Sequence, residues 1–152
     1  MQPLGKAILC VSLLALSACE PSTPSRADTV RGLPAVSMDT ALSAFTRVCA
    51  ASKPSFSRAK ELQATLTNPD AFIFDASKLR DGTPVCSMRA RLPADQNAFQ
   101  ELQRRYGKAQ STGGLLTVFN GYSGGQLIFM SGIKNGAGEG TFQIGLMSGR
   151  SL

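Results

Sequence analysis

The sequence predicts an α+β fold in which a mostly antiparallel sheet of about five strands is covered by about three helices. Three observations support this prediction. Helix-like patterns dominate residues 37–70, one segment from 85 to 92 alternates apolar and polar side chains, and three strand-like segments close the chain. Helices and antiparallel strands that follow one another in this way are typical of α+β domains.

The chain begins with a segment that has the proportions of a secretory signal. Lys6 precedes an apolar run at residues 7–16, which is too short for a transmembrane helix of about 20 residues. The tetrapeptide Leu16-Ser17-Ala18-Cys19 resembles the lipobox of bacterial lipoproteins. This resemblance implies cleavage before Cys19 and attachment of a diacylglycerol to its sulfur, with the thiolate as the nucleophile. An ordinary secretory cleavage site is the alternative, but it would have a small residue in place of Leu16.

These features divide the chain into three parts: a signal peptide at 1–18, a lipidated cysteine with a flexible tether at 19–36, and a single periplasmic domain at 37–152. Three prolines among small polar residues favour an extended tether, which at about 3.1 Å per residue would reach about 50 Å. Glu20, rather than aspartate, follows Cys19. By the sorting rule of enteric lipoproteins, this implies the outer membrane, with the domain facing the periplasm.

Two helices are expected at the start of the domain. Asp39 can cap the first, because its carboxylate accepts from the amides of the first turn. Its apolar stripe contains Phe45 and Cys49, and the helix ends before Pro54. The second is expected to begin near Ser55 or Ser57 and to end at Asn68-Pro69.

Strands are expected at 71–74 and 85–92, with a turn at Asp81-Gly82 between them. In the second strand Cys86 and Met88 share one face, whereas Arg89 and Arg91 lie on the other. Cys49 and Cys86 therefore both point inward. In an oxidising compartment these two cysteines predict a disulfide.

A third helix is expected to open at Pro93 and Asp95 and to end at Gly107. Three strands at 114–120, 126–133 and 141–147 then form a meander, separated by glycine-rich turns at 121–125 and 135–140. The helices cover one face of the sheet. The other face, with Arg89, Arg91, Thr117 and Gln143, is free for solvent or for a partner.

Composition excludes several chemistries. The chain has no histidine, which rules out Ser-His-Asp and Cys-His hydrolases and histidine-ligated zinc. We expect no catalytic residue, no metal and no cofactor. The formal net charge is +6, and it becomes +5 once Lys6 leaves with the signal. In the periplasm this charge favours anionic lipid, cell-wall polymer or acidic protein over nucleic acid.

Ser57-Arg58-Ala59-Lys60 resembles the S-x-x-K nucleophile motif of penicillin-binding proteins, but the chain is far shorter and lacks the S-D-N and K-T-G elements. A helix start with an exposed lysine is the preferred interpretation. The best candidate contact for an anion or a partner is a group of four arginines: Arg89, Arg91, Arg104 and Arg105.

The predicted function is that of a lipid-anchored envelope protein, without enzymatic activity, whose domain binds another envelope component. The partners expected are the membrane, through the lipid, and an envelope protein or cell-wall polymer. The alternative is a binder of anionic cell-wall glycan or lipid through the basic strand face. The pairing of Phe45-x-x-x-Cys49 with Cys86-Ser87-Met88 resembles a pattern in small exported proteins of proteobacteria, a resemblance that implies no activity.

Overall fold

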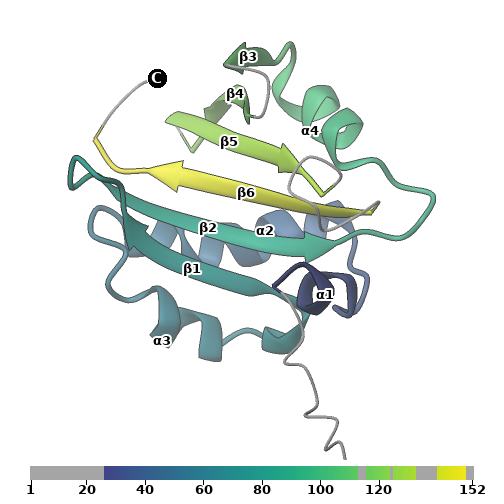
Figure 1. Cartoon of the computed structure of the whole chain (residues 1–152), viewed down its shortest axis with the longest axis horizontal. Helices are drawn as coiled ribbons and strands as arrows, with labels where there is room; N and C mark the ends of the chain where they lie inside the picture. Colours follow the sequence, from purple (N-terminus) through teal and green to yellow (C-terminus); the bar gives the residue numbers. More distant parts are fainter. Residues whose placement is uncertain (1–25, 113–115, 124, 133–139, 150–152) are drawn as a thin grey trace, which may run out of the picture.

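The computed structural model describes residues 26–112, 116–123, 125–132 and 140–149. Four α-helices and six strands form its framework (Figure 1). The helices are α1 (Arg26–Arg31), α2 (Met38–Val48), α3 (Ala59–Ala64) and α4 (Ala98–Tyr106), with short 3₁₀ turns η1 (Ala50–Ser52) and η2 (Pro69–Ala71). The strands are β1 (Ile73–Lys78), β2 (Pro84–Arg91), β3 (Gln110–Thr112), β4 (Leu116–Tyr122), β5 (Gly125–Ser131) and β6 (Thr141–Met147).

The six strands form one antiparallel sheet in the order β1-β2-β6-β5-β4-β3. The last four strands are sequential neighbours, so the predicted C-terminal meander is confirmed and extended by the short strand β3. The chain returns through β6 to pair with β2, which places the N-terminal hairpin and the meander in one sheet. The α+β prediction is confirmed.

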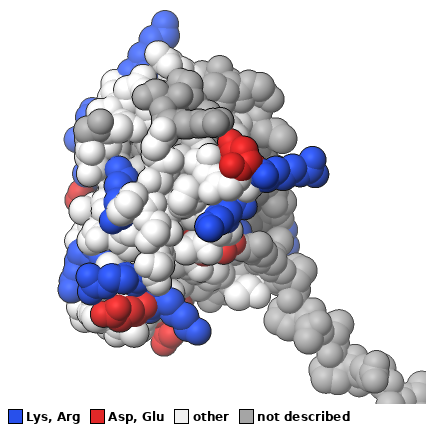
Figure 2. All heavy atoms as spheres, turned by 90° about the vertical axis from the view of Figure 1, so that its left-hand side faces the viewer, with Lys and Arg blue, Asp and Glu red and all other residues white. Residues whose placement is uncertain are grey.

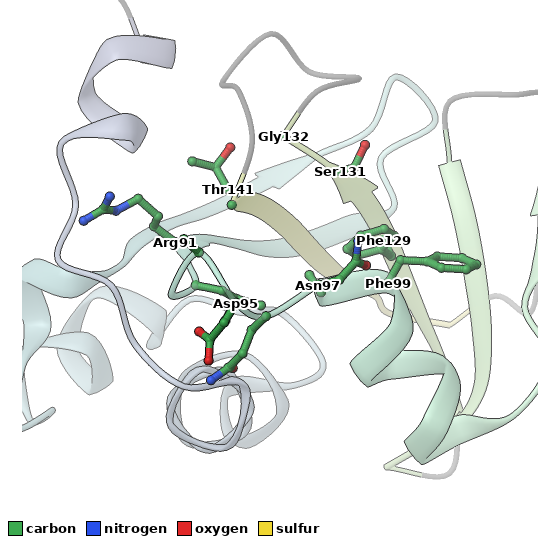
Figure 3. A pocket seen from close by; sticks show the side chains of 13 residues that line it. Arg91, Asp95, Asn97, Phe99, Phe129, Ser131, Gly132 and Thr141 are labelled. Carbon is green, nitrogen blue, oxygen red and sulfur yellow. The ribbon is translucent and has the colours of Figure 1, made fainter.

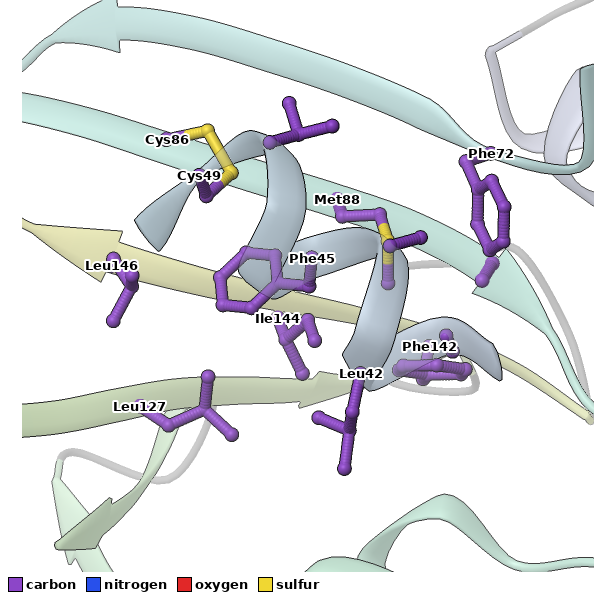
Figure 4. Packing of buried hydrophobic residues seen from close by; sticks show 14 of the residues in the cluster. Leu42, Phe45, Cys49, Phe72, Cys86, Met88, Leu127, Phe142, Ile144 and Leu146 are labelled. Atoms are coloured by element: carbon purple, nitrogen blue, oxygen red, sulfur yellow. A yellow bond between two sulfur atoms is a disulfide. The ribbon is translucent and has the colours of Figure 1, made fainter. Parts of the chain in front are cut away.

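The helices α2, α3 and α4 cover one face of this sheet, and the main core lies between them and the strands. Alternate residues of adjacent strands point into it, as the register of Met88 with Ile144 and of Ile144 with Phe129 shows. From α2, Leu42 and Phe45 pack against these strands (Figure 4). The stripe of helical apolar residues predicted from the sequence is therefore the buried side of α2.

The predicted disulfide between Cys49 and Cys86 is confirmed, with 5.5 Å between the two Cα atoms. Cys49 follows the last turn of α2, and Cys86 lies on the core face of β2. Both residues are fully buried (Figure 4). The bond therefore fastens the end of α2 to strand β2.

The domain begins earlier than the predicted boundary at residue 37. Residues 26–31 form α1 on the face of the sheet opposite to α2 (Figure 1). Val30 and Leu33 are buried there against Ile73, and Ala35 forms a parallel bridge with Arg91. The tether expected over residues 19–36 is thus wrong for residues 26–36, because their apolar side chains have a sheet face to bury against. Cys19 lies outside the described residues.

Several element boundaries also differ. The N-cap of α2 is Ser37, whose hydroxyl accepts from the Thr40 amide at 3.1 Å, whereas Asp39 lies in the first turn. The N-cap of α4 is Asn97 rather than Asp95. Strand β1 begins at Ile73, two residues later than predicted, because η2 precedes it. Ala71 is buried as part of that turn.

Candidate functional site

The candidate site is the sheet face opposite to α2, α3 and α4, which we call the open face. Strand register assigns its residues, since paired residues in neighbouring strands point to the same side. Val85 pairs with Met147, Met130 with Gln143, and Ile128 with both Val118 and Gly145. Of the described helices, α1 lies on this face, over the β1–β2 end of the sheet.

The open face is more apolar than a solvent-facing sheet surface. Antiparallel sheets with one covered face usually carry polar side chains on the other. Here a band of six aliphatic and methionine residues runs over β2, β6, β5 and β4, and five of them are half-exposed while Val118 is buried. The band consists of Val85, Leu116, Val118, Ile128, Met130 and Met147.

Arg89 and Arg91 lie on the open face, as predicted, but they are held by the protein itself. Arg89 is 9 % exposed, and its Nε donates to Gln143 Oε1 at 3.1 Å. Arg91 is half-buried, and its Nε donates to the Leu33 carbonyl at 2.7 Å. Arg91 therefore attaches the turn after α1 to the sheet, whereas Arg89 links β2 to β6, and both border the apolar band.

Arg104 and Arg105 lie on α4, on the other side of the sheet. Arg104 pairs with Glu101 at 3.0 Å, and Arg105 pairs with Asp39 at the start of α2. The structure thus divides the four predicted arginines into two pairs on opposite sides. Thr117 was also misplaced, because it pairs with the core residue Phe129 and points toward the helices.

A cleft of about 450 Å³ adjoins the open face at its Arg91–Thr141 end (Figure 3). One wall is the connection from β2 to α4, and the other is formed by the ends of β5 and β6. Phe99 and Phe129 form an apolar patch with their ring centroids 6.1 Å apart, and the Arg91 guanidinium is directed away from them. The cleft was missed from the sequence because its walls come from segments that are far apart along the chain.

The S-x-x-K residues do not form the arrangement that a serine–lysine nucleophile needs. Ser57 precedes α3, and its hydroxyl lies 2.9 Å from that of Ser55. Among the hydrogen bonds of the described residues, none joins Ser57 to Lys60. A lysine base has to lie within hydrogen-bonding reach of the hydroxyl that it deprotonates.

Comparisons with protein-family models, with curated proteins and with solved structures find no match to this chain. Among the described residues, no helix combines the length and the apolar character that crossing a bilayer requires.

Proposed function

We propose that this protein is a lipid-anchored envelope protein, held at the outer membrane through Cys19, that binds another envelope protein through its open face. The observation that carries the proposal is the band of half-exposed apolar side chains on a sheet face that the main helices leave bare. Apolar patches rimmed by polar side chains are typical of protein–protein contacts. The lipobox-like segment supplies the anchor, and the domain acts by binding rather than by catalysis.

The alternative was an anionic glycan or lipid bound by a basic strand face, and it has less support. Such a site needs several cations that converge on one surface and remain available to the ligand. Arg89 is buried beside Gln143, Arg91 is hydrogen-bonded to Leu33, and the arginines of α4 lie on the other side of the sheet. The apolar band favours a protein partner instead.

A pair of experiments in intact cells tests the two halves of the proposal. Metabolic labelling with a clickable fatty acid should mark the wild-type protein and leave the Cys19→Ala variant unlabelled. A photo-crosslinking amino acid at Met130, on the open face, should yield one discrete protein adduct. The same group at Gln103, an exposed residue of α4, serves as the matched control and should not. Equal adduct patterns at both positions would contradict the open face as the binding surface.

A further inference from the structure

A second surface lies at the edge of the sheet, between β1 and α3. A groove of about 520 Å³ runs there, which we call the β1 groove. Its walls are α3 with the segment before it on one side and the outer edge of β1 on the other. Among its lining residues are Ser55, Ser57, Lys60, Phe74, Ser77 and Lys78. All of them come from described segments, and the groove is separate from the open face.

The backbone of β1 points hydrogen-bonding groups into this groove. In an antiparallel pair, every second residue directs its N–H and C=O away from the partner strand. Leu79 donates to the Thr83 carbonyl at 2.9 Å, and the Pro84 carbonyl accepts from Ser148 on the β6 side. The Pro84 carbonyl thus points away from β1. Because Lys78 pairs with Pro84, the backbone N–H and C=O of Lys78 likewise point away from β2, into the groove.

The alternation then continues along the strand, so that Ala76 and Phe74 also direct their backbone groups outward. Within the described part of the chain, no backbone hydrogen bond joins β1 to a segment other than β2. The edge therefore offers a row of donors and acceptors to a further strand.

The charged side chains of the groove are basic. Lys60 and Lys78 are both exposed, and no ion pair to either occurs among the described residues. Glu61, the acidic residue of α3, is occupied by Arg58 at 3.3 Å. Asp75 also borders the groove, but its register with Ser87 directs its side chain to the open face. Lysine and arginine side chains, with carboxylates between them, are spread over the side of the molecule that faces the viewer in Figure 2.

We infer that the β1 groove binds an extended, acidic segment of a partner protein, which adds to the sheet as a strand beside β1. Backbone hydrogen bonds to Phe74, Ala76 and Lys78 would supply affinity. Acidic side chains on alternate positions would meet Lys60 and Lys78 and supply specificity. A second copy of this chain fits poorly as the added strand, because the one carboxylate of β1, Asp75, points to the open face and cannot meet Lys60 or Lys78. This inference rests on the proposed function as a binding protein, and it names the class of partner that the β1 edge of the sheet would take.

Exposed lysines on an edge strand also have a purely protective role, because they discourage edge-to-edge aggregation. The two roles differ in an observable way. A protective lysine leaves the edge unoccupied whatever peptide is offered, whereas a binding edge takes up an acidic strand and rejects a basic one.

The test uses the purified full chain in detergent and a fluorescein-labelled heptapeptide in which glutamate alternates with valine, followed by fluorescence anisotropy. We expect saturable binding that weakens as salt is raised from about 50 to about 300 mM. Reversing both charges, in Lys60→Glu/Lys78→Glu, should weaken binding about tenfold. Lys108→Glu, at an exposed lysine beyond α4, is the matched control and should bind as the wild type does.

Two further arms separate strand addition from simple charge attraction. Ala76→Pro removes an outward-facing N–H, a position where an edge strand tolerates proline, and should weaken binding about tenfold. A peptide with N-methylated valines should bind equally weakly, and this arm stands even where the proline variant is unstable. A third peptide, in which lysine replaces each glutamate, should not bind. Binding of the methylated or the lysine peptide as tight as that of the glutamate–valine peptide would overturn the inference. No binding at all, or a protein dimer that excludes the peptide in light scattering, would also overturn it.

Failure of the β1 groove and failure of the proposed function are distinguishable. The peptide assay requires neither the lipid nor the open face, and the crosslinking from Met130 does not involve β1. A negative peptide assay with a discrete adduct from position 130 would reject the groove alone. The reverse result would reject the open face and retain the edge.

Discussion

Cys49 and Cys86 form their disulfide inside the hydrophobic core rather than on the surface. The bond closes a loop with a sequence separation of 37 residues. A loop of this length restricts the unfolded chain, and the chain-entropy account gives a stabilisation of about 4 kcal/mol as an upper figure. For a domain whose total stability is on the order of 5–15 kcal/mol, this single bond is a large fraction.

We therefore predict that the Cys49→Ala/Cys86→Ala variant loses about 2–4 kcal/mol of unfolding free energy. Urea denaturation followed by circular dichroism measures the loss. A reducing agent should destabilise the wild type and leave the variant unchanged, which serves as the internal control. A wild-type midpoint that does not respond to full reduction would contradict the prediction.

Tyr122 is a second buried residue with a specific role. Its hydroxyl lies 2.6 Å from Thr46 Oγ1, and the Thr46 hydroxyl donates its own hydrogen to the Leu42 carbonyl at 2.8 Å. Because Thr46 has only that hydrogen, Tyr122 is the donor of the pair. Burial raises the pKa of Tyr122 above its ordinary value. Tyr122 therefore donates this hydrogen bond as a neutral phenol, and burial favours that neutral form.

The raised pKa of Tyr122 makes the unfolding free energy depend on pH. The folded state holds the Tyr122 proton to higher pH than the unfolded state does, so its contribution is complete below about pH 10 and is lost above it. Tyr122→Phe should cost about 1 kcal/mol at pH 7, the net value of one hydrogen bond. It should also show a shallower loss of stability between pH 9 and 11. Urea denaturation across that range, with Tyr106→Phe for comparison, measures both effects.

At the scale of elements, the strands with strict alternation were the most predictable. Strand β6 has the predicted bounds, and β2 differs from its prediction by one residue at each end. Helix α1 was missed because its six residues carry no repeating apolar stripe, and its stability comes from packing of Val30. Contacts between distant segments decide such a helix, and they are not visible in a local pattern.

The same limit applies to the candidate site. Alternation correctly placed Arg89 and Arg91 on one face of β2, but their burial depends on Gln143 and on the turn after α1. The apolar band becomes visible only when the strand register is known, because its members come from four strands. Residue types were readable from the sequence, whereas their neighbours were not.

The attachment of helix α1 to the sheet depends on the burial of Val30. Val30 is 1 % exposed, so Val30→Asp would bury an unpaired charge and should detach α1 from the sheet. Limited proteolysis should then cut the variant near residue 31 while the remaining domain keeps its circular dichroism. Ala35→Asp, at an exposed position of the same segment, should remain resistant. Equal resistance of both variants would show that α1 does not depend on Val30.

For the molecule as a whole, α1 changes the distance between the domain and its proposed anchor. The sequence predicted a tether of about 50 Å over residues 20–36. Because α1 begins at Arg26, only the chain from Cys19 to that residue would link the proposed lipid to the folded domain. At about 3.6 Å per residue, this link spans at most about 25 Å in any conformation. Since α1 lies on the open face, the proposed lipid on Cys19 would hold that face near the membrane, within reach of partners anchored in the same bilayer.

This short link predicts strong energy transfer between the domain and the membrane. We expect a donor dye attached through an unnatural amino acid at Met130, in the lipidated protein on vesicles with acceptor lipid, to transfer efficiently. Inserting about 20 Gly-Ser residues before α1 adds an r.m.s. span of about 25 Å and should lower the efficiency clearly. Val30→Asp should lower it as well, because detaching α1 frees further chain, while Cys19→Ala should show no transfer. The same low transfer efficiency with and without the insertion would contradict the short link. It would mean that more chain than residues 20–25 separates the lipid from the sheet, so that the open face lies away from the bilayer.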